Sequence, residues 1–292
     1  MKKRREIFYF YLFVGPWILG FLVFMAYPLL MSAYYSLTEY NAASNPFFVG
    51  LKNYQRIFQD DLFYKSVKAT LLYTLVSVPI GMLLSLFFAS LLNCKIPGRS
   101  VFRTILYLPS MISGVALSLL WMWIFNPDIG FLNYILSAFG IAPQQWIYDA
   151  HLAIPSLVIM SFWGLGASTV IFLAALQGVP ITLYEAADLD GCPLLIKLFR
   201  ITLPMISPVF LFQLVTSMIA GFQAFTQAFI MTRGGPSYAT HFYVYYLYQK
   251  GFADFELGYS SALAWIMMVV IVIITVFILK ISNRFVYTEE RG

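Results

Sequence analysis

Long runs of apolar residues separated by short polar segments make up most of this 292-residue chain. An α-helix needs about 20 mostly apolar residues to cross the hydrocarbon layer of a membrane. Six runs reach that length, and they predict transmembrane helices over residues 8–37, 67–92, 104–125, 153–176, 206–230 and 258–280. Because the apolar residues are continuous rather than alternating, a transmembrane β-barrel is disfavoured. The pattern therefore predicts an all-α, polytopic membrane protein.

Composition supports this assignment, because 61% of the residues are hydrophobic and only 11% are charged, whereas soluble domains carry about 25% charged residues. The chain contains no internal repeat, no low-complexity tract and no long linker. We therefore expect a single transmembrane domain over residues 1–292, with a core at 67–280. The first apolar run, from Ile7 to Leu37, is too long for a cleaved signal peptide and is expected to remain as a spanning helix.

The distribution of Lys and Arg predicts how the chain is oriented in the membrane. If the N-terminus is cytoplasmic, the cytoplasmic segments hold 12 of the 18 basic residues: Lys2, Lys3, Arg4, Arg5, Lys95, Arg99, Arg103, Lys197, Arg200, Lys280, Arg284 and Arg291. This bias follows the positive-inside rule, so both termini are expected in the cytoplasm. The net charge of +5 comes from residues at helix ends and is not evidence for a nucleic-acid partner. Cys94 and Cys192 fall in cytoplasmic loops and are expected to be reduced.

Several kinds of function are disfavoured by what the predicted spans lack. No Asp, Glu, Lys, Arg or His lies deep within any span, although proton- and ion-coupled transporters generally need such groups. The catalytic constellation of a membrane enzyme is missing, and His151 and His241 lie far apart in outside segments. The sequence has no P-loop motif for binding ATP. We expect no catalytic residues and no metal site, and a pump of this kind would take its energy from another subunit.

One polar segment, Thr182–Pro204, carries five charged residues between two predicted spans and is expected on the cytoplasmic side. Thr182 and Glu185 have the spacing of a capping box, which starts a helix. Gly191 is a stop signal for that helix, and a second short helix is expected to end at Pro204, before the fifth span begins. The segment therefore predicts a helix, a turn and a helix. An isolated capping box is common, and its alternative interpretation is a simple connecting loop.

The complete string in this segment resembles the EAA loop of the permeases of binding-protein-dependent ABC importers. The matching residues are Glu185-Ala186-Ala187, Asp190-Gly191 and Ile201-Thr202-Leu203-Pro204. Three further segments resemble the family's V-G-L-x-N-Y, R-x-x-x-x-L-P and T-x-G-G-P motifs in the family's order: residues 49–54, 103–109 and 231–236. The ordered set is similar to the carbohydrate-uptake branch, on the side of the maltose F and glycerol-phosphate A subunits.

The resemblance implies a permease subunit that forms half of the translocation path for a sugar or oligosaccharide. The implied partners are a second homologous permease, two cytoplasmic ATPase subunits that bind ATP and Mg, and an extracytoplasmic solute-binding protein. This chain would bind no cofactor and hydrolyse no ATP itself. It would lie among lipids in a bacterial or archaeal inner (cell) membrane. The outside loops Asn41–Lys65 and Gly234–Leu257 would be the surface for the binding protein.

The resemblance also implies that the first helix of the polar segment fits a cleft of an ATPase subunit. Closure of the ATPase pair on ATP would then move the loops together and turn the spans toward an outward-open state. The implied coupling residues are Glu185, Ala186, Ala187, Asp190, Gly191, Leu203 and Pro204.

A substrate path is expected along the fourth and fifth spans, which flank the polar segment. The candidate residues are small, polar or aromatic and suit a neutral glycan: Trp163, Gly164, Ser168, Ser217, Gly221, Gln223 and Gln227. The alternative for each is ordinary packing between helices, which often uses small and weakly polar residues. A phosphorylated or acidic substrate would favour an Arg or Lys clamp, which this path lacks, although a partner permease can supply such a charge.

Overall fold

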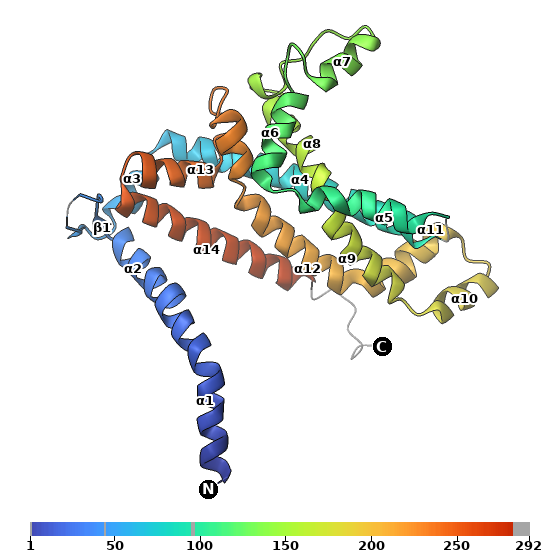
Figure 1. Ribbon diagram of the computed structural model, residues 1–292, viewed down its shortest axis with the longest axis horizontal. Helices are drawn as coiled ribbons and strands as arrows, with labels where there is room; N and C mark the ends of the chain where they lie inside the picture. Colours follow the sequence, from blue (N-terminus) through green and yellow to red (C-terminus); the bar gives the residue numbers. More distant parts are fainter. Residues whose placement is uncertain (1, 44, 95–96, 283–292) are drawn as a thin grey trace. The chain divides into compact units, whose positions relative to one another are not determined.

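The computed structural model describes residues 2–43, 45–94 and 97–282, most of them in α-helices (Figure 1). The described residues group into two compact units. One comprises Met1–Asp61 and Leu247–Val270, and the other comprises Leu62–Tyr246 and Ile271–Gly292. The last long helix, α14 (Leu257–Ser282), contributes residues to both.

The first unit contains the N-terminal helices, a small hairpin and the beginning of α14. Its other elements are α1 (Lys2–Phe21), a π-helical turn (Leu22–Ala26), α2 (Tyr27–Ser36), β1 (Thr38–Glu39), β2 (Phe47–Phe48), α3 (Lys52–Ile57) and a second π-helical turn (Gln249–Ala253). β1 and β2 are antiparallel, with Thr38 opposite Phe48. Asn53 Nδ2 donates hydrogen bonds to the carbonyl oxygens of Ser36 at 2.9 Å and Thr38 at 2.8 Å. This side chain therefore holds α3 against the end of α2 and the hairpin.

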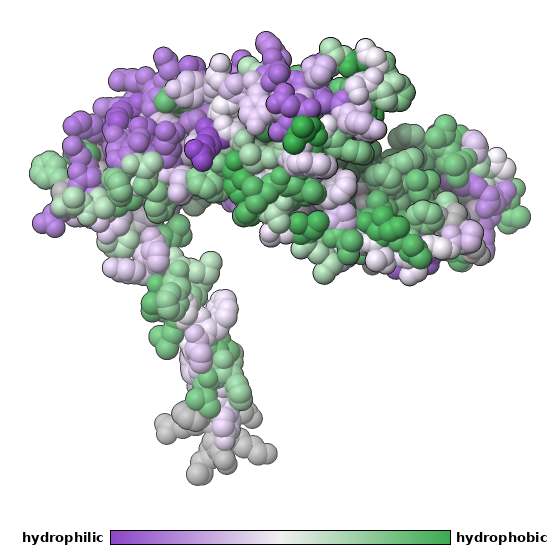
Figure 2. Space-filling view, turned by 45° about the horizontal axis from the view of Figure 1, so that its top comes forward, coloured by the Kyte–Doolittle hydropathy of each residue, from purple (hydrophilic) through white to green (hydrophobic). Residues whose placement is uncertain are grey.

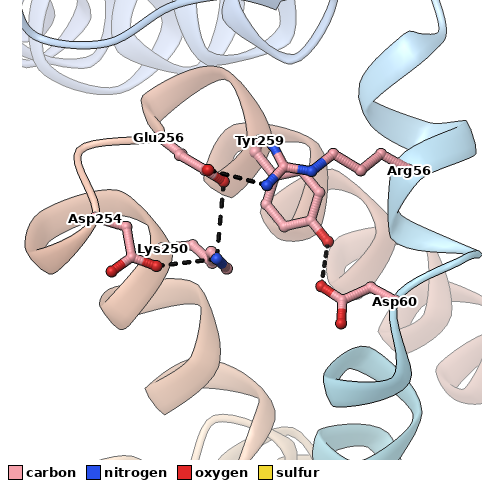
Figure 3. A network of polar contacts seen from close by, with 6 residues as sticks. All are labelled: Arg56, Asp60, Lys250, Asp254, Glu256 and Tyr259. Atoms are coloured by element: carbon pink, nitrogen blue, oxygen red, sulfur yellow. Dashed lines mark hydrogen bonds and ion pairs between the residues drawn. The ribbon is translucent and has the colours of Figure 1, made fainter.

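A network of polar side chains connects α3 to the start of α14 within the same unit (Figure 3). Arg56 Nη2 donates to Glu256 Oε1 at 2.9 Å, and the Arg56 guanidinium lies 4.6 Å from the centroid of the Tyr259 ring. The Tyr259 hydroxyl donates to Asp60 Oδ2 at 2.9 Å. Lys250 lies 3.9 Å from Glu256 Oε2, so two cations face one carboxylate. Single exposed ion pairs contribute little stability, but a connected network fixes the geometry of the segments that carry it.

The second unit contains the remaining helices. They are α4 (Asp61–Asn93, which begins one residue before the unit), α5 (Arg99–Tyr107), α6 (Gly114–Ile124), α7 (Phe131–Ala138), α8 (Ala153–Ser161), α9 (Gly166–Gln177), α10 (Ile181–Leu189), α11 (Leu194–Lys197), α12 (Leu203–Phe222) and α13 (Tyr243–Tyr248, whose last two residues belong to the first unit). Short 3₁₀ turns cover Leu108–Met111, Trp146–Tyr148 and Phe162–Gly164, and π-helical turns cover Leu198–Thr202 and Ala228–Thr232.

Four helical segments in the described part of the chain are long and apolar enough to cross a membrane: Tyr9–Ser36, Asp61–Asn93, Leu194–Phe222 and Leu257–Ser282. Two bent pairs bring the number to six if each pair is one span. The first pair, Arg99–Met111 with Gly114–Ile124, bends by 100°, and the second, Ala153–Gly164 with Gly166–Gln177, bends by 52°. The structure is therefore an all-α membrane fold, but the third and fourth predicted spans are broken rather than straight.

Each bend has a local cause. After the 3₁₀ turn that contains Pro109, Ser113 adopts an extended conformation, and its hydroxyl caps α6 by accepting a bond from the Ala116 N–H at 3.3 Å. In the second pair, the backbone of Gly166 lies directly against Leu106, where an added Cβ would be 2.2 Å from the carbonyl oxygen. Only glycine permits that approach, which sets the start of α9 beside the end of α5.

The fifth span differs from its predicted limits of 206–230. The helix begins at Leu194, passes through the π-helical turn Leu198–Thr202 and ends at Phe222. The prediction that Pro204 ends a separate helix is wrong. Pro204 lies in the first turn of α12, directly after the wide π-helical turn. Proline has no N–H to donate, and its ring crowds the preceding carbonyl groups. The wide π-helical turn accommodates both effects, so the helix continues past Pro204.

The core of the second unit consists of two apolar clusters that share α4. One surrounds Trp121, Phe125 and Phe242, and the other surrounds Phe172 and Ile206. Outside these clusters, large apolar side chains lie on the surface, and Figure 2 shows apolar residues over much of the face that it draws. In the segment Tyr9–Ser36, none of the 18-residue apolar window is buried within the chain. Exposed apolar surface of this extent is what a membrane-embedded helix presents to lipid or to another spanning helix.

Candidate translocation cavity and coupling loop

A cavity of about 490 Å³ lies within the second unit, between α4, the α8–α9 pair and the end of α12. Its walls carry hydroxyl, amide, aromatic and small side chains: Tyr73, Ser77, Val78, Gly81, Met82, Ser85, Ser161, Phe162, Gly164, Leu165, Ser168, Ser217, Ala220, Gly221, Gln223, Ala224, Phe225, Thr226 and Gln227. Every one of these residues is uncharged at neutral pH. The volume falls within the range of small-molecule sites, and its polar groups are neutral hydrogen-bonding groups.

Six of the seven residues predicted for the substrate path line this single cavity: Gly164, Ser168, Ser217, Gly221, Gln223 and Gln227. Trp163 does not line it. The residue is 44% exposed, and its ring makes an edge-to-face contact with Trp121, with the ring centroids 5.8 Å apart. The fourth and fifth spans therefore bring together their small and polar residues, while the tryptophan lies outside the cavity.

The α4 wall of the cavity was missed by sequence reasoning, although its signal is present. Tyr73, Ser77, Gly81 and Ser85 all line the cavity and follow one another at intervals of four residues. That spacing places them on one face of a helix. Among the described residues, the buried Ser85 hydroxyl has no hydrogen-bond partner.

The end of α12 interrupts the helix at the cavity. α12 ends at Phe222, Gln223 caps it, and a π-helical turn begins at Ala228. Gly221 lies so close to α4 that an added Cβ would be 2.7 Å from Thr74 Cγ2. Irregular backbone at membrane depth is tolerated where it is buried in protein or lines a cavity. The break therefore exposes the amide side chain of Gln223 and the residues that follow it to the cavity.

The polar segment between α9 and α12 has the predicted first helix and turn. α10 ends in a Schellman motif: the Gly191 N–H donates to Asp188 O at 3.0 Å, and the Cys192 N–H donates to Ala187 O at 2.9 Å. Gly191 has φ +68°, the left-handed conformation that this motif requires, so the predicted glycine stop is confirmed. Asp190 is the C-cap residue just before it.

The predicted capping box is wrong. α10 begins at Ile181 with Pro180 as its N-cap, and no side-chain hydrogen bond caps it. Thr182 therefore lies inside the helix. The fixed backbone geometry of Pro180 defines the start of the helix and removes one N–H from the turn before it. Glu185 is exposed on the outer surface of α10 and is free for contact with another molecule rather than engaged in a cap.

Two side-chain contacts join α10 to the helix that follows it. Lys197 Nζ donates to Asp188 Oδ1, and the Tyr184 and Thr202 hydroxyls are 2.9 Å apart. Leu203 and Pro204, two of the predicted coupling residues, come directly after Thr202 at the start of α12. This candidate coupling loop, residues 181–204 (the coupling loop below), is thus connected to the fifth span both through the backbone and through these contacts.

The coupling loop presents apolar side chains outward. Leu189 is 91% exposed and Leu194 is 82% exposed, on either side of the Gly191 turn. Ile181, Leu195 and Phe199 are also largely exposed, and Ala186 is exposed beside Glu185. Large apolar side chains rimmed by charged residues are typical of a protein–protein contact surface. In the described part of the chain, no group of three or more His, Cys, Asp or Glu residues is arranged to hold a metal ion.

The sequence profile of the family described as "Binding-protein-dependent transport system inner membrane component" matches residues 77–287. The chain belongs to this family. The match covers α4 from Ser77 onward, the cavity-lining spans and the coupling loop. The chain is therefore a membrane permease component of a binding-protein-dependent ABC transport system.

Three curated permeases are similar over nearly their whole length. The probable ABC transporter permease protein YesP of Bacillus subtilis is 38% identical over 100% of this chain and 97% of its own length. The arabinooligosaccharides transport system permease protein AraP of B. subtilis is 34% identical over 96% of this chain and 92% of its own. The sn-glycerol-3-phosphate transport system permease protein UgpA of Yersinia pestis is 33% identical over 96% and 95%.

Two solved structures resemble this permease in fold. A chain in the crystal structure of a bacterial alginate ABC transporter, in complex with an alginate pentasaccharide-bound periplasmic protein, matches with a TM-score of 0.86 and 24% identity over 98% of both chains. A chain in a second structure, of a bacterial ABC transporter involved in the import of alginate, matches with a TM-score of 0.84 and 25% identity over 98% of this chain and 99% of that one. The broken spans of this permease thus belong to a known membrane fold.

Proposed function

We propose that this permease forms half of the translocation path of an ATP-driven importer for a neutral sugar or oligosaccharide. The observation that carries the proposal is the uncharged cavity, which is lined by serine hydroxyls, two glutamine amides and aromatic rings. Hydroxyl and amide groups both donate and accept hydrogen bonds, as the hydroxyl groups of a sugar do. Phe162 and Phe225 offer apolar surface to the C–H faces of a sugar ring. The name of the similar permease AraP, which refers to arabinooligosaccharides, supports the same substrate class.

A phosphorylated or acidic substrate is less favoured for this chain. Phosphate and carboxylate groups are bound best by charge-assisted hydrogen bonds, above all from Arg. The residues that line the cavity include no Arg, Lys or His. A cationic group for such a substrate would have to come from the partner permease.

The proposed coupling to ATP runs through the loop at residues 181–204. We infer that α10 fits a cleft of a cytoplasmic ATPase subunit, with Glu185 in polar contact and Ala186 and Ala187 allowing close approach. The exposed Leu189 and Leu194 support an apolar contact on either side of the turn. ATP and Mg would be bound by two such ATPase subunits, and this chain would hydrolyse no ATP. Movement of the loop would pass to α12 as a rigid-body displacement.

The proposed outside partner is a solute-binding protein that contacts Asn41–Lys65 and Gly234–Leu257. Some described residues of both segments are held by side-chain hydrogen bonds. Arg56 and Glu256, one from each segment, are joined by the polar network in Figure 3. In the second segment, Thr240 Oγ1 bonds the Gly235 carbonyl oxygen at 2.6 Å. A fixed surface lowers the entropy that a partner must remove on binding.

The proposed assembly contains this chain, a second homologous permease, two ATPase subunits and the binding protein. Residues 1–292 would act as one permease domain in a bacterial or archaeal cell membrane, with both termini in the cytoplasm. Fusion of a reporter that is active only in the cytoplasm to each end tests the orientation. Activity at both ends supports it, and activity at one end alone contradicts the six-span topology.

Uptake by the reconstituted assembly tests the function. The ligand of the binding protein encoded nearby is identified first, and its radiolabelled form is offered to proteoliposomes that contain the assembly. We expect uptake that requires ATP inside and binding protein outside, and that persists when a protonophore dissipates the proton gradient. Uptake that stops with the protonophore while ATP is intact would identify an ion-coupled secondary transporter instead.

A further inference from the structure

One loop of the second unit holds three exposed residues in a backbone conformation that favours glycine. This loop, residues 232–241, follows the fifth span and lies outside in the proposed topology. Arg233, Ser237 and Tyr238 have φ values of +48°, +49° and +63°, and all three are exposed. A Cβ makes this left-handed conformation unfavourable, whereas glycine adopts it readily. Residues held in such a conformation cluster at functional sites, so these side chains call for an explanation.

Buried contacts fix the base of this loop. The Thr240 hydroxyl is fully buried and lies 2.6 Å from both the Thr232 hydroxyl and the Gly235 carbonyl oxygen. His241 is also buried, and an added Cβ at Gly234 would lie only 2.7 Å from its Cδ2 atom. An ordered base of this kind holds the exposed residues of the loop in their unfavourable conformation.

The outside cations of the two units differ in whether this chain neutralises them. Six of the 18 basic residues are predicted to lie outside. Three of them belong to the first unit and pair with a carboxylate: Lys52, Arg56 and Lys250. Three belong to the second unit, are exposed and have no ion pair in the described part of the chain: Lys65, Lys68 and Arg233. The second unit therefore presents uncompensated positive charge outside.

Two of these uncompensated cations belong to the same surface as the exposed tyrosine of the loop. Lys65, near the start of α4, has its Nζ atom 5.1 Å from the centroid of the Tyr238 ring, which is a cation–π distance. The Tyr238 ring also makes an edge-to-face contact with buried His241, with the ring centroids 5.5 Å apart. The side chain of Arg233 makes no hydrogen bond, ion pair or ring contact among the described residues. Arginine and tyrosine are the residue types that most often carry the binding energy of protein interfaces.

We propose that Arg233, Tyr238 and Lys65 form a docking site for an acidic surface of the solute-binding protein. The proposal rests on the proposed importer function and adds the chemistry by which the outside partner is recognised. Uncompensated cations attract a negative surface and repel a positive one, which speeds encounter and sets its orientation. The family is binding-protein-dependent, so an outside protein partner belongs to the system. Side chains held in a fixed arrangement suit a folded protein better than mobile lipid headgroups.

The first test measures how fast the binding protein encoded nearby associates with the complete importer in nanodiscs of neutral phospholipid. The association rate of the parent should fall as salt rises, because ions screen the attraction. At low salt, Arg233→Gln and Lys65→Gln should each lower the rate about threefold to tenfold, and the difference should nearly vanish at high salt. Arg233→Lys keeps the charge and should keep most of the rate. Arg99→Gln, which removes one positive charge at the predicted cytoplasmic end of α5, is the matched control and should have no effect.

Cross-linking identifies the partner of Lys65. A water-soluble carbodiimide condenses an amine with a carboxylate held against it to form an amide, and it does not couple a guanidinium. With the binding protein present, mass spectrometry should find Lys65 joined to an Asp or Glu of that protein. Lys65→Arg keeps the charge but loses the amine, so it should keep the association rate and lose this cross-link.

The aromatic part of the site is tested by the dissociation rate. Tyr238→Ala removes the ring and should raise the dissociation rate about fivefold, the effect of losing one aromatic anchor of an interface. The salt dependence of association should remain, because both cations are still present. Tyr238→Phe keeps the ring and should dissociate at nearly the parental rate. Unchanged dissociation in Tyr238→Ala would overturn the place of this residue in the site.

Parental association rates in both Gln variants, association that does not depend on salt, or a Lys65 cross-link to the second permease instead of the binding protein would overturn the docking site. Uptake distinguishes this failure from failure of the importer function. If the binding protein supports ATP-dependent uptake by the parent while both Gln variants associate normally, the importer function stands and the docking site is wrong. If it neither binds the parent nor supports its uptake, the proposed function is wrong, and the docking site falls with it.

Discussion

The proposed substrate cavity and the proposed coupling loop both lie at interruptions of the long helices of this permease, but they direct their side chains to different environments. At the cavity, neutral amides and hydroxyls around the interruption after Phe222 line a concave space of about 490 Å³. At the coupling loop, the turn at Gly191 separates two exposed leucines, Leu189 and Leu194. The cavity therefore suits a small polar molecule, and the loop suits a protein surface.

The two regions also differ in how their geometry is fixed. The cavity depends on close approach of helices, as between Gly221 and Thr74, where space for even one methyl group is lacking. The loop depends on backbone conformation: Gly191 has φ +68° but has no described atom within 4 Å of an added Cβ. Glycine is required at position 221 for space and at position 191 for backbone conformation. Substitutions at these two positions should therefore show which of the two requirements holds in each region.

The largest effect is expected at the turn of the coupling loop. Gly191→Asp places a side chain in the left-handed conformation and adds a negative charge next to Asp190, so the Schellman turn and the direction of α10 should change. We predict that ATP-dependent uptake falls to background while the protein still inserts in the membrane, as measured by its amount in washed membranes. Gly191→Asn is the matched control, because it adds a side chain of nearly the same size that tolerates this conformation without adding the charge, and it should keep most of the uptake. Wild-type uptake in Gly191→Asp would show that the turn does not set the coupling.

A smaller but clear effect is expected at the close contact behind the cavity. Gly221→Ala would place Cβ 2.7 Å from Thr74 Cγ2 and force α12 away from α4. Overpacking of this kind costs about 1–3 kcal/mol, so we predict that uptake falls about tenfold. Gly164→Ala also alters a cavity-lining glycine, but no described atom lies within 4 Å of its added Cβ, and it should be tolerated.

Relief of the contact provides a second check on the same prediction. Thr74→Ala removes the clashing methyl group, and the Thr74 hydroxyl is buried without a hydrogen-bond partner among the described residues. Its removal therefore leaves no partner unsatisfied. The double variant Gly221→Ala with Thr74→Ala should recover most of the uptake. No recovery would show that the glycine is needed for backbone freedom rather than for space.

The sequence predicted these two regions unequally well, for physical reasons. Gly191 and its turn were predictable because a Schellman motif depends on residues adjacent in the chain. The start of α10 was not predictable, because a capping pattern competes with Pro180. The continuation of the helix past Pro204 was not predictable either, because a π-helical turn has no simple residue signature. Polar residues of the fourth and fifth spans were recognised one by one, but their meeting with α4 depends on tertiary packing. The four-residue spacing from Tyr73 to Ser85 was the available signal for that third wall.

Loss of one amide in the cavity should have a moderate effect confined to substrate handling. Gln223→Leu keeps the approximate size of the side chain but removes its hydrogen-bonding groups at the break in α12. A lost hydrogen bond to a sugar is worth about 1 kcal/mol, so we predict a roughly fivefold fall in sugar uptake. ATP hydrolysis by the assembly should be unchanged, whereas Gly191→Asp should lower both. Gln223→Asn, which keeps an amide, should recover part of the uptake, and an equal loss in both Gln223 variants would favour a packing role.

The smallest effect is expected from the side-chain contacts that join α10 to the following helix. Tyr184→Phe removes only the hydroxyl that lies 2.9 Å from that of Thr202, and Asp188→Asn removes the charge that pairs with Lys197. The Asp188 side chain is 68% exposed, and exposed ion pairs are worth at most about 1 kcal/mol. We predict that each variant lowers the amount of sugar transported per ATP hydrolysed by less than about threefold. At high salt the effect of Asp188→Asn should be smaller than that of Tyr184→Phe, because ions screen the Asp188–Lys197 pair. A loss as large as that of Gly191→Asp would mean that these side chains position the loop. The contrast between a loop fixed by backbone conformation and a cavity fixed by helix packing would then no longer hold.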